Sequence, residues 1–203
     1  MFNRELKTEA LKRLEQEKKN FDSQLSMTTH RIEAFYEKKL EALNSINDFD
    51  LDIDSLKDKP LNIEEKLYRI NFVLKNSNYK KERLELDSFN CENISFDDIG
   101  GFAGIFTGII SSKLNKEISE CATRKIEYLK NEIQELKKIT SNIDFSFKEL
   151  DCQLSTFLDI VKYKINLKGK SHWSELSDEE INYIGSAVNL AFAIANMLMK
   201  KGI

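Results

Sequence analysis

The sequence has very few residues that interrupt helices. One Pro and seven Gly occur among its 203 residues. Folds made of many short strands need Gly and Pro at their turns, whereas a helix interior disfavours both residues. This scarcity argues against an all-β fold and favours long, uninterrupted helices.

Cysteine and histidine are also scarce. The three cysteines, Cys91, Cys121 and Cys152, are far apart and form no CxxC pair, and the only histidines are His30 and His172. A zinc site needs such residues grouped at short spacings, and a disulfide framework usually has an even number of cysteines. We therefore expect no metal site. We expect His30 on an exposed helix face and His172 as a loop anchor.

Neither sign of charge predominates. The chain has 31 Lys and Arg against 34 Asp and Glu, with a net charge of −3 and a pI near 5.6. Because Lys and Glu alternate along the chain, they are typical of solvated helix faces and do not indicate a nucleic-acid partner. The charged first seven residues lack the apolar run of a signal peptide, so we expect a cytoplasmic protein. Richness in Lys, Asn, Ile and Phe suggests a bacterial, AT-rich genome.

Two short motifs resemble binding loops but lack required residues. The sequence Gly169-Lys170-Ser171 needs another Gly five residues before it to be a phosphate loop, and Lys164 occupies that position. The alternating acids of residues 48–54 need Gly and Glu at the sixth and twelfth positions of a calcium loop, which are Ile53 and Lys59. No group of nucleophile, His and acid is evident. We therefore expect no cofactor, no catalytic residue and no enzyme, although a catalytic cluster assembled from distant positions remains an alternative.

The N-terminal quarter predicts one coiled-coil helix over residues 1–48. Its apolar residues recur at spacings of three, four and seven, as in a heptad repeat. Lys18, Thr28 and Lys39 interrupt the stripe. The apolar members are Leu11, Leu14, Phe21, Leu25, Ile32, Phe35, Ala42 and Ile46.

Residues 60–95 predict short helices and a loop, and residues 96–166 predict a long helix. The heptad pattern of the long helix continues through residues 140–142, which by composition alone would be a turn, so a kink near Ser141 is the alternative. Five apolar residues stand seven apart in it, namely Leu129, Leu136, Ile143, Leu150 and Phe157.

The long helix begins with a glycine zipper. Gly100, Gly104 and Gly108 are four residues apart within the uncharged stretch 99–110. In a helix they would line one face and allow another backbone to approach closely.

The C-terminal segment, residues 177–201, predicts an apolar helix. Ser177 and Glu180 form the capping box that opens it, and the 19 residues from Ile181 to Met199 are uncharged. That length is enough for a membrane span, which is the alternative to a buried helix in a soluble bundle. Gly185 gives the helix a small face, which we expect to pack against the glycine zipper. Three amides stand seven apart and indicate a polar seam at a core position, namely Asn182, Asn189 and Asn196.

This layout resembles that of uncharacterised bacterial proteins with a coiled coil, a glycine-rich apolar middle and a helical tail. Residues 100–110 and 177–198 carry the resemblance, which implies no activity. A charged helical hairpin that hides an apolar segment is also similar in outline to α-helical pore-forming toxins.

The sequence predicts a single elongated all-α domain, with long antiparallel coiled-coil helices and a small helical head. The head contains the glycine-zipper helix and the apolar C-terminal helix. We expect an interaction or scaffold protein that pairs with itself or with another helical protein. A membrane-active effector or pore-forming toxin component is the alternative.

Overall fold

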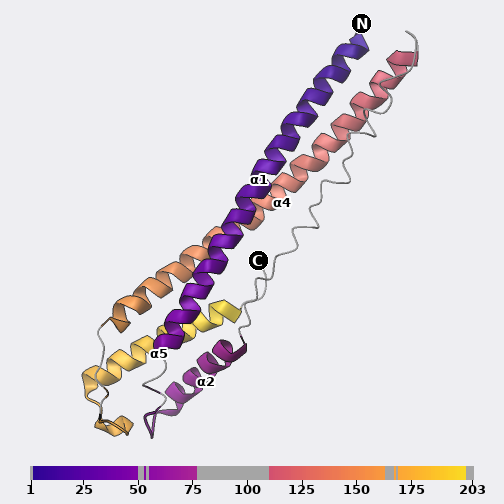
Figure 1. The fold of residues 1–203 in the computed structure, drawn as a ribbon. Helices are drawn as coiled ribbons and strands as arrows, with labels where there is room; N and C mark the ends of the chain where they lie inside the picture. The colour runs from indigo at the N-terminus through magenta and orange to yellow at the C-terminus, as the bar shows by residue number, and fades with distance from the viewer. Residues whose placement is uncertain are drawn as a thin grey trace. The chain divides into compact units, whose positions relative to one another are not determined.

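In the computed structural model the described residues are 2–49, 53, 55–76, 110–162, 167 and 169–199. They form four α-helices and one short 3-10 helix, and no strand occurs among them (Figure 1). The expected all-α fold class is therefore confirmed. The elements are α1 (Phe2–Phe49), α2 (Leu61–Asn76), α4 (Ile110–Val161), η3 (Trp173–Glu175) and α5 (Asp178–Met199).

Contacts divide the chain into two units, and α1 and α4 each run through both. Unit 1 comprises Met1–His30 with Glu82–Ser141, and unit 2 comprises Arg31–Lys81 with Asn142–Ile203. Each unit is described by itself below. Thr140 and Ser141 lie inside α4, so the helix is continuous there, as the heptad pattern predicts.

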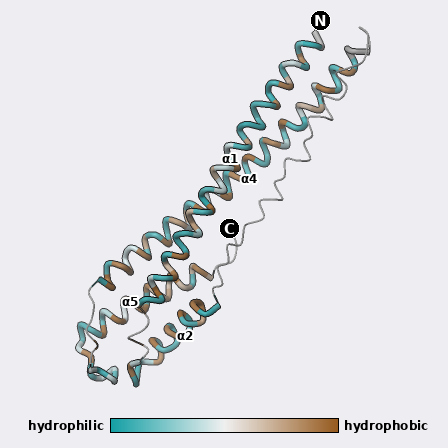
Figure 2. Tube along the Cα trace, viewed as in Figure 1, coloured by the Kyte–Doolittle hydropathy of each residue, from teal (hydrophilic) through white to brown (hydrophobic). Residues whose placement is uncertain are grey.

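The core of unit 1 lies between the first part of α1 and the first part of α4. Hydrophobic positions recur between hydrophilic ones along both helices, as the alternating colours in Figure 2 show. Burial of these side chains away from water supplies the stabilisation of the pair. The buried cluster consists of Ala10, Leu14 and Phe21 of α1 with Ile118, Ala122, Leu129, Ile133 and Leu136 of α4.

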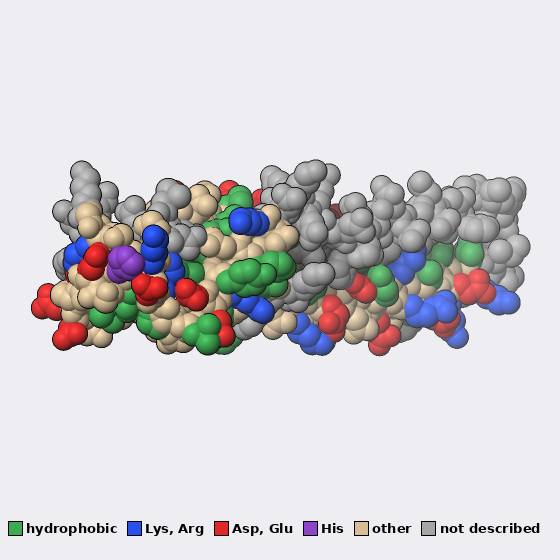
Figure 3. All heavy atoms as spheres, turned by 90° about the horizontal axis from the view of Figure 1, so that it is seen from below, with side chains coloured by type: hydrophobic (Ala, Val, Ile, Leu, Met, Phe, Trp, Pro, Cys, Tyr) green, Lys and Arg blue, Asp and Glu red, His purple; other side chains and the backbone are tan. Residues whose placement is uncertain are grey.

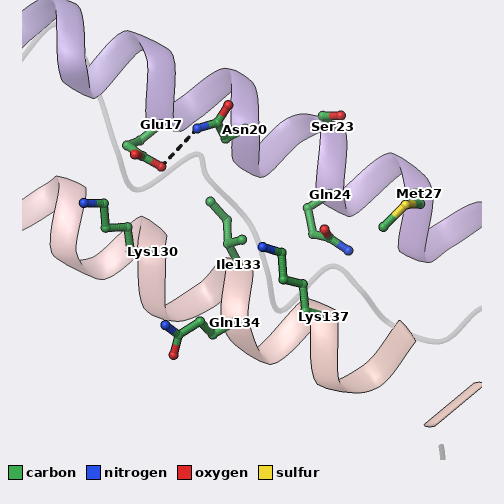
Figure 4. Close-up of a pocket in the computed structure, with 9 residues that line it drawn as sticks. All are labelled: Glu17, Asn20, Ser23, Gln24, Met27, Lys130, Ile133, Gln134 and Lys137. Carbon is green, nitrogen blue, oxygen red and sulfur yellow. Dashed lines mark hydrogen bonds between the residues drawn. The ribbon is translucent and has the colours of Figure 1, made fainter. Parts of the chain in front are cut away.

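In each unit α1 and α4 run parallel, not antiparallel as predicted. In unit 2, Arg31 pairs with Asp144, and seven residues later Lys38 pairs with Asp151, so both helices advance together. In unit 1, the residue numbers along both ribbons rise in the same direction in Figure 4. The prediction of antiparallel long helices is wrong because a heptad stripe has the same spacing in either direction. Within unit 2, α2 runs back against the direction of the second part of α1 (Figure 1).

Unit 2 adds α2 and α5 to the second parts of α1 and α4. Pro60 starts α2, because its carbonyl oxygen accepts the Ile63 and Glu64 N–H groups at 2.9 and 3.1 Å. The inner faces of α2 and α5 pack against each other. The buried residues are Ile63, Leu67, Ile70 and Val73 of α2, with Ile184, Ala187, Val188, Ala191, Ile194, Ala195 and Leu198 of α5.

The glycine zipper lies outside the described residues. Gly100, Gly104 and Gly108 belong to residues 77–109, where no structure is described. The zipper and its packing against the C-terminal helix therefore stay predictions.

Candidate helix-interaction surfaces

A buried polar layer interrupts the apolar core of unit 1. Gln24 and Thr28 of α1 and Thr140 of α4 are only 8%, 0% and 7% exposed. The Thr28 and Thr140 hydroxyl oxygens are 2.9 Å apart, and the Gln24 amide nitrogen lies 3.4 Å from each of them. The layer thus joins the two helices by side-chain hydrogen bonds.

The polar layer is nearly, but not fully, satisfied. The Thr28 and Thr140 hydroxyls also lie 2.8 Å from backbone carbonyl oxygens, that of Gln24 for Thr28 and that of Leu136 for Thr140. The carbonyl oxygen of the Gln24 side chain has no hydrogen-bond partner among the described residues. The hydrogen bonds of a buried polar layer form only when its residues stand at the same height along the two helices. The layer therefore favours one register of the two helices.

A groove of about 410 Å³ opens beside this layer within unit 1 (Figure 4). Its lining is mostly polar and charged, with three amides, two lysines and one carboxylate. The lining residues are Glu17, Asn20, Ser23, Gln24 and Met27 of α1 with Lys130, Ile133, Gln134 and Lys137 of α4.

Ion pairs connect α1 and α4 within unit 2. The Arg31 and Asp144 side chains approach to 3.5 Å, and the Lys38 ammonium lies 2.9 Å from Asp151 and 2.8 Å from Glu41. The hydrogen bonds to Glu41 and Asp151 raise the pKa of Lys38 above its usual value.

Lys39, on the neighbouring face of α1, is in a different environment. Its ammonium lies 4.5 Å from the centre of the Phe35 ring, as in a cation–π contact. Burial lowers the pKa of Lys39 below its usual value. The pKa values of the neighbouring Lys38 and Lys39 are thus shifted in opposite directions.

The connection after α1 and the connection before α5 are held together within unit 2. The Lys57 N–H donates to the Ser171 carbonyl oxygen at 2.8 Å, and the Trp173 N–H donates to the Lys57 carbonyl oxygen at 2.9 Å. The His172 ring lies 2.8 Å from a carboxylate oxygen of Asp58. His172 is therefore a loop anchor, as predicted, and His30 is exposed on α1, also as predicted.

Two carboxylates complete this junction. Glu175 accepts the backbone N–H groups of Ser171 and His172 at 2.7 and 3.2 Å, which lowers its pKa. Lys170 approaches Glu180 to 2.6 Å and is the main cause of the lowered pKa of Glu180.

The predicted capping box at the start of α5 is present. The Ser177 N–H donates to the Glu180 carboxylate at 2.7 Å, and the Glu180 N–H donates to the Ser177 hydroxyl at 3.3 Å. The first turn of α5 therefore has the hydrogen bonds that its sequence predicts.

The three predicted seam amides of α5 are not in the core. Asn182 and Asn189 are exposed and Asn196 is half-buried. Asn189 accepts a hydrogen bond from Lys66 of α2 at 2.6 Å. The prediction of a core seam is wrong because α5 is apolar nearly all round, so spacing alone does not tell which face turns inward.

Gly185 does not make a close helix contact among the described residues. A Cβ added there would meet nothing within 4 Å. The role predicted for Gly185, close packing against the glycine zipper, thus remains a prediction. Neither the zipper residues nor a neighbour at Gly185 is described.

α5 is long and apolar enough to cross a membrane. It is the single such helix among the described residues, and 39% of its most apolar window is buried inside the structure. This is weak support for a span, because the core helix of a soluble protein has the same composition.

The described residues contain no group of three or more His, Cys, Asp or Glu that could hold a metal ion. Cys121 is half-buried, Cys152 is exposed and both are free thiols, whereas Cys91 lies outside the described residues.

Two features were missed in the sequence. Gln24 is not predicted to be buried, because a single Gln beside Asp22 and Ser23 is typical of a solvated face. The second feature is an exposed stripe on α2 made of Leu61, Tyr68 and Phe72. Their spacing of seven and four residues is the pattern that predicts such a stripe.

Comparison with protein-family models, curated proteins and solved structures finds no match to this chain.

Proposed function

We propose that this chain is a non-enzymatic, cytoplasmic interaction protein that acts by pairing helices with a second copy of itself or with another helical protein. The observation that carries the proposal is the number of large hydrophobic side chains at the surface of the helices, part of which is visible in Figure 3. They are Leu6, Met27 and Leu40 of α1, Leu61, Tyr68 and Phe72 of α2, Tyr128 and Phe145 of α4, and Met199 of α5.

Burying such side chains supplies free energy for association. Each Å² of apolar surface removed from water is worth about 25 cal/mol, and aromatic residues are enriched at the centres of protein interfaces. Single exposed apolar residues are ordinary, but three in one stripe on a 16-residue helix, as on α2, are not. The surface thus supports recognition of another helix better than it supports chemistry.

The finer architecture belongs to the same proposal. We infer that the parallel α1 and α4 form a coiled coil, supported by the buried residues seven apart in each helix. We also infer that Gly100, Gly104 and Gly108 pack closely against another helix, supported by their spacing alone. If so, Gly104→Leu will lower the stability and the assembled mass of the protein, and an unchanged variant will contradict this packing.

Light scattering of the full chain tests the proposed function. We expect the average mass to rise with concentration from one chain of 23.6 kDa toward two chains or more. A mass of one chain at every concentration up to the solubility limit would contradict self-association.

A membrane-active effector or pore-forming component is the second candidate, and the apolar length of α5 favours it. Lys200 and Lys201 follow that helix and suit an interface with anionic lipid headgroups. The test is co-sedimentation with vesicles of phosphatidylcholine and phosphatidylglycerol, with release of an enclosed dye. Binding and dye release would favour this candidate over the first. Assembly in buffer without vesicle binding would exclude it.

A further inference from the structure

The outer face of α2 has an apolar stripe. Leu61, Tyr68 and Phe72 are 70%, 75% and 46% exposed. At 3.6 residues per turn the three side chains lie within about 40° of one another around the helix. The opposite face of α2 packs against α5, so the stripe is the side of α2 that the described residues leave open.

Two opposite charges lie on one flank of the stripe, and Glu64 and Lys75 lie on the other flank. Glu65 stands between Leu61 and Tyr68 in the sequence, and Arg69 follows Tyr68. Both are exposed, and neither forms an ion pair with a described residue. The order along α2 is therefore apolar, acidic, aromatic, basic, aromatic.

This order is complementary to itself when it is reversed. In an antiparallel pair of α2 helices with a two-fold axis between Lys66 and Leu67, Leu61 is level with Phe72 of the second copy. Tyr68 is level with Glu65 of the second copy, whose carboxylate can accept the phenol O–H. Glu65 also comes within one residue of the level of Arg69, on the same flank of the stripe. Each contact occurs twice, as two-fold symmetry requires.

We propose that the stripe formed by Leu61, Tyr68 and Phe72 of α2 is the surface by which two copies of this chain associate, antiparallel and about a two-fold axis. The inference deepens the proposed function, because it names the partner and the surface. The apolar side chains supply the free energy, and the Glu65–Arg69 pairs select the antiparallel arrangement.

The dimer is expected to be weak. A stable interface buries about 800 Å² on each partner, and one stripe on a helix of this length covers less than that. The charged pairs lie at the rim of the contact, where each contributes at most about 1 kcal/mol. Association is therefore concentration-dependent, with rapid exchange of copies.

Charge reversal tests this arrangement on the full chain. Glu65→Arg places two Arg–Arg contacts in the homodimer, and Arg69→Glu places two Glu–Glu contacts there. We expect sedimentation velocity to show each variant alone at least tenfold weaker in self-association than the wild type. An equal mixture of the two variants restores opposite charges at both contacts, as does the double variant Glu65→Arg/Arg69→Glu, and both are expected to associate like the wild type.

Arg124→Glu, at an exposed position of α4, is the matched control and leaves association unchanged. Far-UV circular dichroism establishes that each variant is folded. Unchanged association of both single variants, or failure of the mixture to associate, would overturn the proposal for α2. In either case the proposed function stands if the wild type still assembles. A wild type that remains a single chain contradicts this inference and self-association, and leaves pairing with another helical protein as the proposed function.

Discussion

At the scale of single residues, the polar layer has a cost as well as a benefit. Gln24, Thr28 and Thr140 are buried in positions that an apolar side chain would fill without a partner. Their hydrogen bonds repay the loss of water contacts only while all three are present. The layer is therefore expected to specify which helices pair more than to strengthen the pair.

We predict that the double variant Thr28→Val/Thr140→Val lowers the free energy of unfolding by about 1–3 kcal/mol, because it leaves the Gln24 amide buried without a partner. The triple variant that adds Gln24→Leu removes the remaining polar group and recovers this loss. Urea denaturation followed by circular dichroism measures both. A triple variant less stable than the double would show that the layer does not work as one unit.

We also predict that acid weakens unit 2 through Glu175 and Glu180. The pKa of each is lowered in the folded chain, by backbone N–H groups at Glu175 and mainly by Lys170 at Glu180. Their contribution to the stability of the folded chain is thus fully present above the unfolded pKa of about 4.3. It is lost as pH falls through the lower pKa values of the folded chain. The thermal midpoint should fall between pH 5 and pH 3, and less steeply in Glu175→Gln/Glu180→Gln. Equal slopes would exclude these two groups as the cause.

At the scale of elements, heptad spacing predicts which residues are buried but not how the helices are directed. Leu129, Leu136, Ile143, Leu150 and Phe157 stand seven apart and all are buried. That spacing is the same whether α1 and α4 are parallel or antiparallel, because the apolar stripes can pack against each other in both arrangements. The same limit applies to α5, whose nearly continuous apolar surface conceals which face is outward.

Gly185 provides a prediction for α5 as an element. Gly in a helix interior is less stable than Ala by about 0.5–1 kcal/mol, and the described residues leave room for a Cβ at this position. Gly185→Ala should therefore raise the free energy of unfolding by about that amount.

Ala191→Leu is the matched opposite case. Ala191 is fully buried, so a larger side chain there should cost about 1–3 kcal/mol. Thermal unfolding of the two variants measures both changes. A destabilised Gly185→Ala would instead indicate that another helix lies against Gly185, as a glycine zipper requires.

At the scale of the whole molecule, the two units differ in how many described helices build their cores. Unit 1 has parts of α1 and α4, whereas unit 2 adds α2 and α5 to the second parts of the same helices. A core of four helices buries more apolar surface per helix than a pair does. The units are therefore expected to open with different free energies.

We predict that amide hydrogens of unit 1, such as those at Leu129 and Leu136, exchange with solvent faster than those at Ile184 and Ile194 of unit 2. Hydrogen exchange followed by mass spectrometry of peptides measures this without any substitution. Equal protection at both pairs would show that the chain opens as one cooperative unit.

The backbone bridge at Lys57 limits where this chain tolerates added sequence. Lys57 holds Ser171 with its N–H and Trp173 with its carbonyl oxygen, so residues inserted beside Lys57, or between Ser171 and Trp173, would break these hydrogen bonds. Tags, cleavage sites or circularly permuted ends placed at those points would therefore disturb both loops at once.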